Sequence, residues 1–462
     1  MILTGWQAPH LKLNLRPATL SIGDHPLHYA WVMVLLAATM RLVSSGFRSS
    51  ASVLIPRLVE VFGWSYGMVG GAFALQWLVS GLFSPVAGWL GDRYGARTTI
   101  LLGGLLFIVG MVLTSTVNHA WQFYLYFGVI LSAAMGIFQV PLTAAVTLWF
   151  RRHLGVGMGI LQASQGIGPL VAVPIILLIF NGFGGGVSGL RAAFWIPGVG
   201  GGLILLLLAR LFYNEPADIN ARPLGAAADE PVRSVSRGQA AQTRTRIFSR
   251  QVMRTPTFWN LISIHFWGCA GHAIILVFLV AIAEERGVSV AMAAGTFMTL
   301  TVTSTLTRFA VPVLADNFGS RGIMAVCFFL QVAPVFLLFF AQDAWMFYLF
   351  AVLFGIGFGG EMTAFPIINR QYYGSAPIGT TYGYQMMGAG IGMAVGAWLG
   401  GLLRDVTDSF TATITMSLIF SALGVLSILF LPRTSQELLP GWEENLPEEY
   451  RSTPGPIHSH GD

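Results

Sequence analysis

The sequence predicts an all-α membrane protein with twelve transmembrane helices in two pseudo-symmetric bundles of six. Three observations support this fold class. Apolar residues make up 55% of the 462-residue chain and charged residues only 10%, whereas soluble domains carry about 25% charged residues. Apolar segments of about 20 residues, the length that crosses the hydrocarbon core of a bilayer, recur along the chain. A short charged motif also occurs twice, as expected of a duplicated bundle.

The apolar segments define the twelve predicted helices. They lie at residues 29–58, 66–90, 98–117, 121–149, 155–180, 192–212, 258–283, 291–314, 323–340, 345–368, 379–403 and 412–431. The first six form an N-terminal bundle over residues 29–212, and the last six form a C-terminal bundle over residues 257–431. Residues 1–28 are then a cytoplasmic N-terminal segment, and residues 213–256 a cytoplasmic linker. The Glu- and Pro-rich residues 432–462 are expected to be a disordered cytoplasmic tail.

The repeated motif follows the second predicted helix of each bundle. It reads GWLGDRYGAR at Gly88–Arg97 and PVLADNFGSR at Pro312–Arg321. Four positions are identical: Leu90 and Leu314, Asp92 and Asp316, Gly95 and Gly319, and Arg97 and Arg321. Because internal repeats underlie many transporter folds, this motif predicts a secondary transporter.

Basic residues are unevenly divided between the predicted loops, and this orients the chain, because Lys and Arg of short loops are retained on the cytoplasmic side. The inner loops hold Arg93, Arg97, Arg151, Arg152, Arg321 and Arg370. The outer loops hold Arg57, Arg191, Arg286 and Arg404. We therefore expect a multi-pass protein of the plasma (inner) membrane with both termini in the cytoplasm. The pI of about 9.4 reflects this topology, and no nucleic-acid partner is expected.

The central linker carries seven arginines among Ala, Ser, Pro and Gln. It is either a flexible tether or, from about Arg244 to Met253, a basic amphipathic segment lying on anionic lipid. Cys269 and Cys327 both fall inside apolar segments and predict neither a disulfide nor a zinc site. No cofactor is expected.

The duplicated motif resembles the signature of the major facilitator superfamily, and the twelve-helix layout with a long central loop agrees over nearly the whole chain. The resemblance implies the major facilitator fold and a latch that holds the outward-facing state. The latch residues would be Gly88, Asp92, Arg93, Gly95, Arg97, Asp316 and Arg321. Asp92 would face the partly positive N-terminus of a helix in the other half. The second copy has Asn317 in place of Arg93, so its latch is expected to be weaker; alternatively, these charges only set topology.

The segment GFRSSASVLIPRLVEVFGWS, Gly46–Ser65, is similar to the group of monocarboxylate transporters and oxalate/formate antiporters. Arg308 stands eight residues before Asp316, as an arginine does in that group. The resemblance implies a small organic anion as substrate, moved with protons or in exchange for a counter-anion. Some relatives that handle dicarboxylates have a lysine on the eleventh helix, whereas the only lysine of this chain is Lys12. The resemblance therefore implies a single carboxylate, although Arg48 could supply a second cation.

Buried arginines lead to the same substrate class. Charged side chains are kept in the hydrocarbon region mainly where they face a cavity, a partner or a ligand, and guanidinium forks match carboxylates. Helical spacing puts Arg41, Ser44, Ser45 and Arg48 on one face of the first helix and Thr301, Ser304, Thr305 and Arg308 on one face of the eighth. We expect Arg48 and Arg308 to bind substrate, and Arg41 to be a gate or a helix anchor. Either binding arginine could instead pair with a buried acid, and Arg48 could reach the outer surface.

Further polar residues are candidates for the same cavity: Gln139, Gln162, Tyr382 and Gln385. Glu361, in FGGEMTAFP, is the carboxylate placed deepest in a predicted helix, and it could exchange a proton when substrate competes for an arginine. A permanent Glu361–Arg salt bridge is the alternative. His265 and His272, seven residues apart, are further coupling candidates because imidazole titrates near neutral pH. They are too far apart to share a metal ion, and no metal is expected.

The leading hypothesis is a carrier of small organic anions, a monocarboxylate above all, that works by alternating access and is coupled to protons or to exchange. Its partners would be the anion, protons or a counter-anion, and the lipid bilayer. The alternatives are a carrier or efflux pump for neutral or cationic compounds, in which Glu361 binds the cation, and a membrane sensor without sustained flux. An enzyme is not expected, because no nucleophile and base pair or metal triad is evident.

Overall fold

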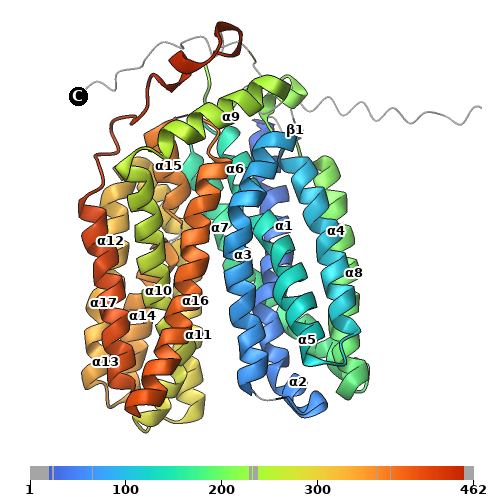
Figure 1. Cartoon of the computed structure of the whole chain (residues 1–462), viewed down its shortest axis with the longest axis vertical. Coiled ribbons are helices and arrows are strands. Elements are labelled where there is room, and N and C mark those ends of the chain that lie inside the picture. The colour runs from blue at the N-terminus through green and yellow to red at the C-terminus, as the bar shows by residue number, and fades with distance from the viewer. Residues whose placement is uncertain are drawn as a thin grey trace, which may run out of the picture.

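The two halves of the chain form two helical bundles that stand side by side (Figure 1). The computed structural model describes residues 20–22, 25–64, 66–227, 232, 238–361, 363–374 and 376–451. In this part of the chain, twelve helices are long and apolar enough to cross a membrane. The predicted all-α fold class is therefore confirmed, apart from a short hairpin before the first helix. Residues 1–19 of the predicted N-terminal segment and 452–462 of the predicted tail lie outside the described residues.

The N-terminal half contains the following elements, in chain order. They are β1 Leu20–Ile22, β2 His25–Leu27, α1 Tyr29–Ser50, η1 Ala51–Leu54, α2 Ile55–Phe62, α3 Tyr66–Tyr94, α4 Ala96–Ser115, α5 Ala120–Phe123, η2 Tyr124–Leu131, α6 Ser132–Leu148, α7 Leu154–Gly182, α8 Gly186–Leu211 and η3 Pro216–Ile219. Strands β1 and β2 pair antiparallel, with Leu20 opposite Leu27.

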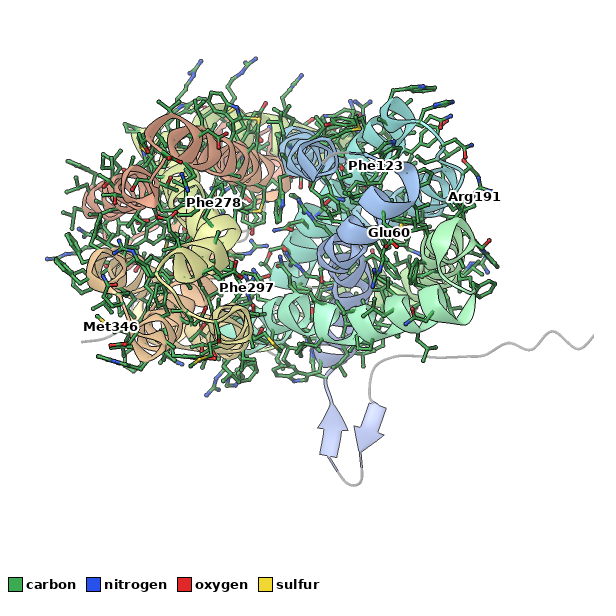
Figure 2. All side chains as sticks on the ribbon, turned by 90° about the horizontal axis from the view of Figure 1, so that it is seen from below. Glu60, Phe123, Arg191, Phe278, Phe297 and Met346 are labelled. Atoms are coloured by element: carbon green, nitrogen blue, oxygen red, sulfur yellow. The ribbon has the colours of Figure 1, made fainter. Side chains whose placement is uncertain are left out.

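The linker and the C-terminal half follow. Their elements are α9 Gly238–Val252, α10 Pro256–Glu285, α11 Val290–Phe318, α12 Ser320–Val332, η4 Ala333–Phe336, α13 Leu337–Phe340, α14 Ala344–Glu361, α15 Phe365–Tyr373, α16 Gly379–Thr407, α17 Phe410–Leu429, η5 Trp442–Asn445 and η6 Glu448–Tyr450. We call the end of the molecule that carries α9 the linker end; Figure 2 views the two halves from the opposite end, with Arg191 on the N-terminal half and Met346 on the C-terminal half.

Four predicted helices are not continuous α-helices in the structure. The fourth contains η2 and the ninth contains η4, and the first and tenth are interrupted as follows. The first, predicted over residues 29–58, ends at Ser50 and continues through η1 into α2. The tenth, predicted over residues 345–368, is divided into α14 and α15. Pro366 lies in the first turn of α15, where proline is tolerated because its missing N–H would have had no partner. The interruption leaves Glu361 at the C-terminal end of α14, inside the bundle.

The two halves approach closely along α3 with α16 and along α7 with α11. Glycines make this approach possible at the linker end. A Cβ on Gly88 would meet the carbonyl oxygen of Gly379 and the Cα of Thr380, and one on Gly155 would meet the carbonyl oxygen of Pro312. Small residues allow helix backbones in membranes to come this close.

Replacing Gly88 with valine is therefore expected to keep the linker end from closing. The added carbons would overlap the backbone of α16, which cannot move aside as a flexible side chain can. Electron–electron resonance distances between spin labels at positions 210 and 322, exposed at the linker end of α8 and α12, would measure the effect. We expect the short-distance population to be lost. A matched Gly70→Val change on the same helix, read with the same label pair, should leave it in place, because Gly70 is exposed and a Cβ there meets open space.

The linker forms a helix where a flexible tether was the first interpretation. Helix α9 lies across the linker end (Figure 1) and buries Arg244, Phe248 and Val252. Residues 228–231 and 233–237 of the linker lie outside the described residues. The prediction of a disordered tail is wrong for residues 432–451, because Trp442 and Leu446 are buried against the rest of the protein.

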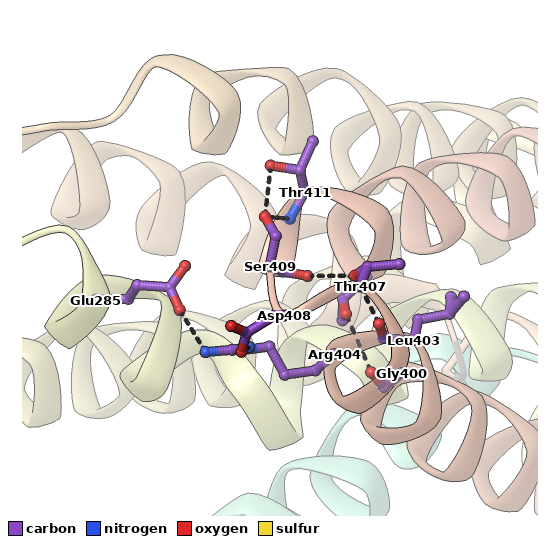
Figure 3. A network of polar contacts seen from close by, with 9 residues as sticks. Glu285, Gly400, Leu403, Arg404, Thr407, Asp408, Ser409 and Thr411 are labelled. Carbon is purple, nitrogen blue, oxygen red and sulfur yellow. Dashed lines mark hydrogen bonds and ion pairs between the residues drawn. The ribbon is translucent and has the colours of Figure 1, made fainter.

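At the opposite end, a polar network ties the helices of the C-terminal half together (Figure 3). Arg404 of α16 donates to Glu285 at the end of α10, at 3.1 Å, and to Asp408, at 2.8 Å. Asp408 ends α16 in a left-handed conformation, with φ of 52°. Because all three side chains belong to the C-terminal half, this network stiffens that half without joining it to the other.

Candidate functional site

The first motif copy makes a contact between the halves. Asp92, near the end of α3, accepts hydrogen bonds from the backbone N–H and the hydroxyl of Thr380, at 2.6 and 2.7 Å. Thr380 is the second residue of α16, so the carboxylate lies at the N-terminus of that helix, where the helix dipole favours negative charge. This is the geometry that the sequence predicts for Asp92.

The second copy makes the equivalent contact with one hydrogen bond. Asp316 accepts from the backbone N–H of Gly155, at 2.8 Å, at the start of α7. Arg97 donates to the carbonyl of Arg210 at the end of α8, and Arg321 donates to the carbonyl of Leu429 at the end of α17. Each arginine thus satisfies a carbonyl at the C-terminus of the last helix of its own half.

The remaining residues of the predicted latch lie around these contacts. Arg93 packs on Trp89 and Tyr94, with its guanidinium carbon 5.1 and 5.3 Å from the two ring centres. Gly95 ends α3 with φ of 85° and allows Arg97 to bond through its backbone N–H to Asn214, at 2.7 Å. These contacts stay within the N-terminal half. Arg370 of α15 donates to Thr147 of α6, at 2.7 Å, and so adds a further hydrogen bond between the halves at the linker end.

Replacing Asp92 with asparagine is expected to favour opening of the linker end. The change keeps the shape of the side chain and removes its charge, and hydrogen bonds to charged groups are worth about 1.5–3 kcal/mol. The population open at this end should rise by about tenfold or more, as read from the 210–322 label distances. Asp316→Asn, which removes the charge behind one hydrogen bond instead of two, should have the smaller effect; the reverse order would contradict this interpretation.

A cluster of charged and aromatic side chains lies deeper in the C-terminal half. Glu361 accepts a hydrogen bond from, or shares a proton with, Nδ1 of His272 of α10, at 2.8 Å. Phe358 of α14 contacts both His272, with ring centres 4.7 Å apart, and Arg308 of α11, whose guanidinium carbon is 5.2 Å from the ring centre. Arg308 is also close enough to interact electrostatically with Glu361. The cluster thus connects a guanidinium to a carboxylate and an imidazole.

Arg308 lies ten residues before the end of α11, about 15 Å from the linker end. Its side chain is 7% exposed. In the described part of the chain it forms no ion pair, although its charge interacts with those of Glu361 and Arg41. The permanent Glu361–Arg salt bridge, which the sequence left open as an alternative, is not among the ion pairs of the described residues.

Arg41 of α1 approaches this cluster from the N-terminal half. Its Nη1 donates to the Thr143 hydroxyl of α6, at 3.1 Å, and its Nη2 is buried without a hydrogen-bond partner among the described residues. It interacts electrostatically with Arg308 and with Tyr382 of α16. The sequence interpretation of Arg41 as a gate or anchor gave it a smaller role than this position indicates. Two guanidinium groups, one from each half, thus lie near each other.

Arg48, expected to bind substrate, has a different environment. Its guanidinium carbon lies 3.6 Å from the centre of the Trp77 ring of α3, a cation–π contact. Its Nε and Nη2 are buried without hydrogen-bond partners among the described residues. Arg48 thus lies about two turns further along the same face of α1 than Arg41, held against an aromatic ring of α3.

The other predicted polar residues are divided between the halves. Gln139 of α6 contacts the Met386 sulfur of α16, at 3.3 Å. Gln162 of α7 is buried, and its Oε1 has no partner in the described structure. Gln385 forms two hydrogen bonds with Asn369 of α15, at 2.9 and 3.0 Å, so both the oxygen and the nitrogen of its amide have a partner inside the C-terminal half.

His265 and His272 do not act on one group. The ring of His265 stacks on Phe365, with ring centres 3.6 Å apart, and neither of its nitrogens has a partner among the described residues. Only His272 contacts Glu361. The sequence offers both histidines as coupling candidates, because imidazole titrates near neutral pH. In the structure, only one of them has a hydrogen-bonded carboxylate as partner.

The structure brings Cys269 close to this pair. Ligand atoms of Cys269, His272 and Glu361 lie within 4.8 Å of one another, and all three residues are buried. These are residue types that bind zinc, which the sequence interpretation did not expect here. Nδ1 of His272 already faces Glu361, and its Nε2 faces the Met393 sulfur, at 3.2 Å. Both ring nitrogens are therefore occupied by protein groups, which fits a hydrogen-bonded acid–imidazole pair better than a metal ligand.

The sequence matches the family model of the Major Facilitator Superfamily over residues 37–322 and 265–454, and the chain belongs to this superfamily. Among curated relatives, it is 24% identical to the oxalate:formate antiporter of Oxalobacter formigenes, over 85% of this chain and 92% of the relative. It is also 24% identical to monocarboxylate transporter 13 of Bos taurus, over 87% of this chain and 89% of the relative.

Solved structures share the fold at lower identity. The proton:xylose symporter XylE, bound to 6-bromo-6-deoxy-D-glucose, superposes with a TM-score of 0.68 at 16% identity, over 90% of this chain and 98% of that chain. FucP in the outward conformation superposes with a TM-score of 0.66 at 16% identity, over 88% of this chain and 100% of that chain. The resemblance predicted from the duplicated motif is confirmed, including the similarity to the monocarboxylate and oxalate:formate group.

Proposed function

We propose that this protein carries a small organic anion, a monocarboxylate above all, across the plasma or inner membrane by alternating access. The observation that supports this most strongly is the pair of guanidinium groups of Arg308 and Arg41. They come from opposite halves, are buried, and form no ion pair in the described part of the chain. A buried guanidinium is retained where a partner or ligand satisfies it, and a carboxylate matches its fork.

The charges of the site favour an anion as substrate. Arg41 and Arg308 contribute two positive charges and ionised Glu361 one negative charge, so the site is positive whether Glu361 is ionised or protonated. Protonation of Glu361 strengthens the attraction for an anion, because it removes the competing carboxylate. Proton and substrate thus bind together, and this is the basis of proton coupling in the proposal. The monocarboxylate and oxalate:formate relatives support the substrate class.

Alternating access follows from the same geometry. The hydrogen bonds that join the two halves in the described part of the chain lie between the bundle centre and the linker end. We assign the linker end to the cytoplasm, with both termini inside, since the arginine-rich loops and α9 lie there. The structure is then closed to the cytoplasm, and rocking of one half against the other, with release of Asp92 and Asp316, opens it.

Uptake into proteoliposomes tests the proposal. Labelled monocarboxylates, dicarboxylates, sugars and organic cations are offered to the purified wild-type protein, with and without a proton gradient directed inward. We expect saturable uptake of at least one monocarboxylate, increased by the gradient. Uptake of cations or sugars without carboxylate flux from a folded protein would overturn the proposal and assign Glu361 to another substrate.

A further inference from the structure

Helix α9 and the C-terminal tail pack together over the contact between the two halves. Arg244 of α9 donates to the Glu443 carboxylate, at 2.5 Å, and to the carbonyl of Tyr450, at 2.9 Å. Its guanidinium carbon also lies 4.9 Å from the ring centre of Trp442. One buried arginine thus holds three residues of the tail at once, and Gln251 adds a hydrogen bond to the Trp442 carbonyl, at 3.3 Å.

The tail is in turn attached to the C-terminal half. The Tyr372 hydroxyl of α15 donates to the carbonyl of Pro432, at 2.7 Å, and the backbone N–H of Leu438 donates to the carbonyl of Tyr372, at 2.9 Å. Phe248 of α9 packs edge-on against both Tyr373 and Trp442, with ring centres 5.5 and 5.2 Å apart. The tail, α9 and α15 therefore form one aromatic cluster at the linker end.

The same helix reaches the N-terminal half. Helix α9 packs against α3 as well as against α16. Arg244 and Thr245 line a partly open cavity of about 50 Å³ whose other walls include Asp92, Gly88 and Gly379. These are the residues of the contact between α3 and α16, so that α9 covers the Asp92–Thr380 hydrogen bonds on the side of the linker end.

We propose that α9 and residues 432–451 form a clasp that stabilises the conformation closed at the linker end. The clasp contacts both halves, because α9 packs against α3 and α16, and it lies beside the hydrogen bonds between Asp92 and Thr380. Opening of the linker end separates α3 from α16, and α9 cannot keep its contacts with both. These contacts therefore stabilise the closed conformation and not the open one. Displacement of the tail would then favour opening and so control transport.

The inference rests on the alternating-access part of the proposed function, and it is tested without a substrate. Distances between spin labels at positions 210 and 322 are measured for Arg244→Gln, Glu443→Gln and the double variant, and for a chain ending at residue 437. We expect each single change to raise the population open at the linker end about fivefold or more. The double variant should add little to the larger single effect, because both residues belong to one contact.

Arg250→Gln is the matched control, since Arg250 is an exposed arginine of the same helix. It should leave the distances unchanged. The clasp is overturned if Arg244→Gln and the shortened chain give the wild-type distribution under conditions in which Asp92→Asn opens the linker end. If Arg244→Gln does not fold, Glu443→Gln alone decides the same question. If these variants shift the distance distribution but the wild-type protein transports no carboxylate, the clasp is supported and only the proposed substrate is overturned.

Discussion

Replacing Arg308 with glutamine is expected to abolish carboxylate uptake. In the proposed site this guanidinium is the cation of the C-terminal half that faces the substrate, and truncation of one partner of a buried charge pair costs about 2–5 kcal/mol. The affinity for the carboxylate should fall by about 100-fold or more. Initial rates of uptake into proteoliposomes, measured over a range of substrate concentrations, would show the loss as a raised KM or as an undetectable flux.

Three further arginine variants make this test specific. Arg308→Lys keeps the charge and loses the planar fork, so we expect weak, residual uptake. Arg191→Gln, at an exposed arginine that bonds to Asn118 far from the site, should transport as the wild type does. Arg48→Gln distinguishes the two binding candidates of the sequence, since Arg48 stacks on Trp77. Full activity of Arg308→Gln combined with loss in Arg48→Gln would move the substrate site to the first helix.

Replacing Glu361 with glutamine is expected to separate substrate movement from the proton gradient. The amide keeps a hydrogen-bonding partner for His272 but cannot exchange a proton, and it leaves the two guanidinium charges permanently uncompensated. Accumulation driven by an inward proton gradient should be lost, whereas exchange of labelled for unlabelled carboxylate should persist. The two are measured in the same proteoliposomes, as gradient-driven uptake and as counterflow.

The control for Glu361 is His272→Gln, which removes the imidazole and retains the carboxyl group. Proton-driven uptake should be reduced in rate but still present, because the proton is bound by Glu361 and His272 positions it. Unaltered gradient-driven accumulation in Glu361→Gln would rule out this carboxyl group as the coupling residue. If Glu361→Gln also loses counterflow, the role of Glu361 is structural.

The architecture was accessible from the sequence because its signals are strong and local. Runs of about 20 apolar residues identify spanning helices, and the motif around Asp92 and Asp316 reports the duplication directly. The interruptions were not accessible in the same way. The break between α14 and α15 lies beside Pro366 and beside glycines that pack closely before Glu361. The apolar content of the segment does not show either feature. The packing of α9 on the tail requires a contact between Arg244 and Glu443, about 200 positions apart, that no periodicity indicates.

The sequence predicted the charged residues of the candidate site but not their arrangement. Arg308 and Glu361 stand out in the sequence because charge is costly in hydrocarbon, and His272 because imidazole titrates near neutral pH. The structure brings these three together. Phe358, which lies between Arg308 and His272, gave no signal because aromatic residues are common in such helices. Arg41 was ranked below Arg48 on depth alone. Its proximity to Arg308 comes from the packing of one half against the other, and this packing cannot be predicted from a single sequence.

Direct measurement of carboxylate binding tests the central claim most directly. Isothermal titration of a transported monocarboxylate into purified wild type, Arg308→Gln, Arg41→Gln and Arg191→Gln separates binding from flux and from coupling. We predict saturable binding to the wild type and to Arg191→Gln, and loss of binding in Arg308→Gln and Arg41→Gln. Binding of the same affinity to all four proteins would contradict a site formed by the two guanidinium groups.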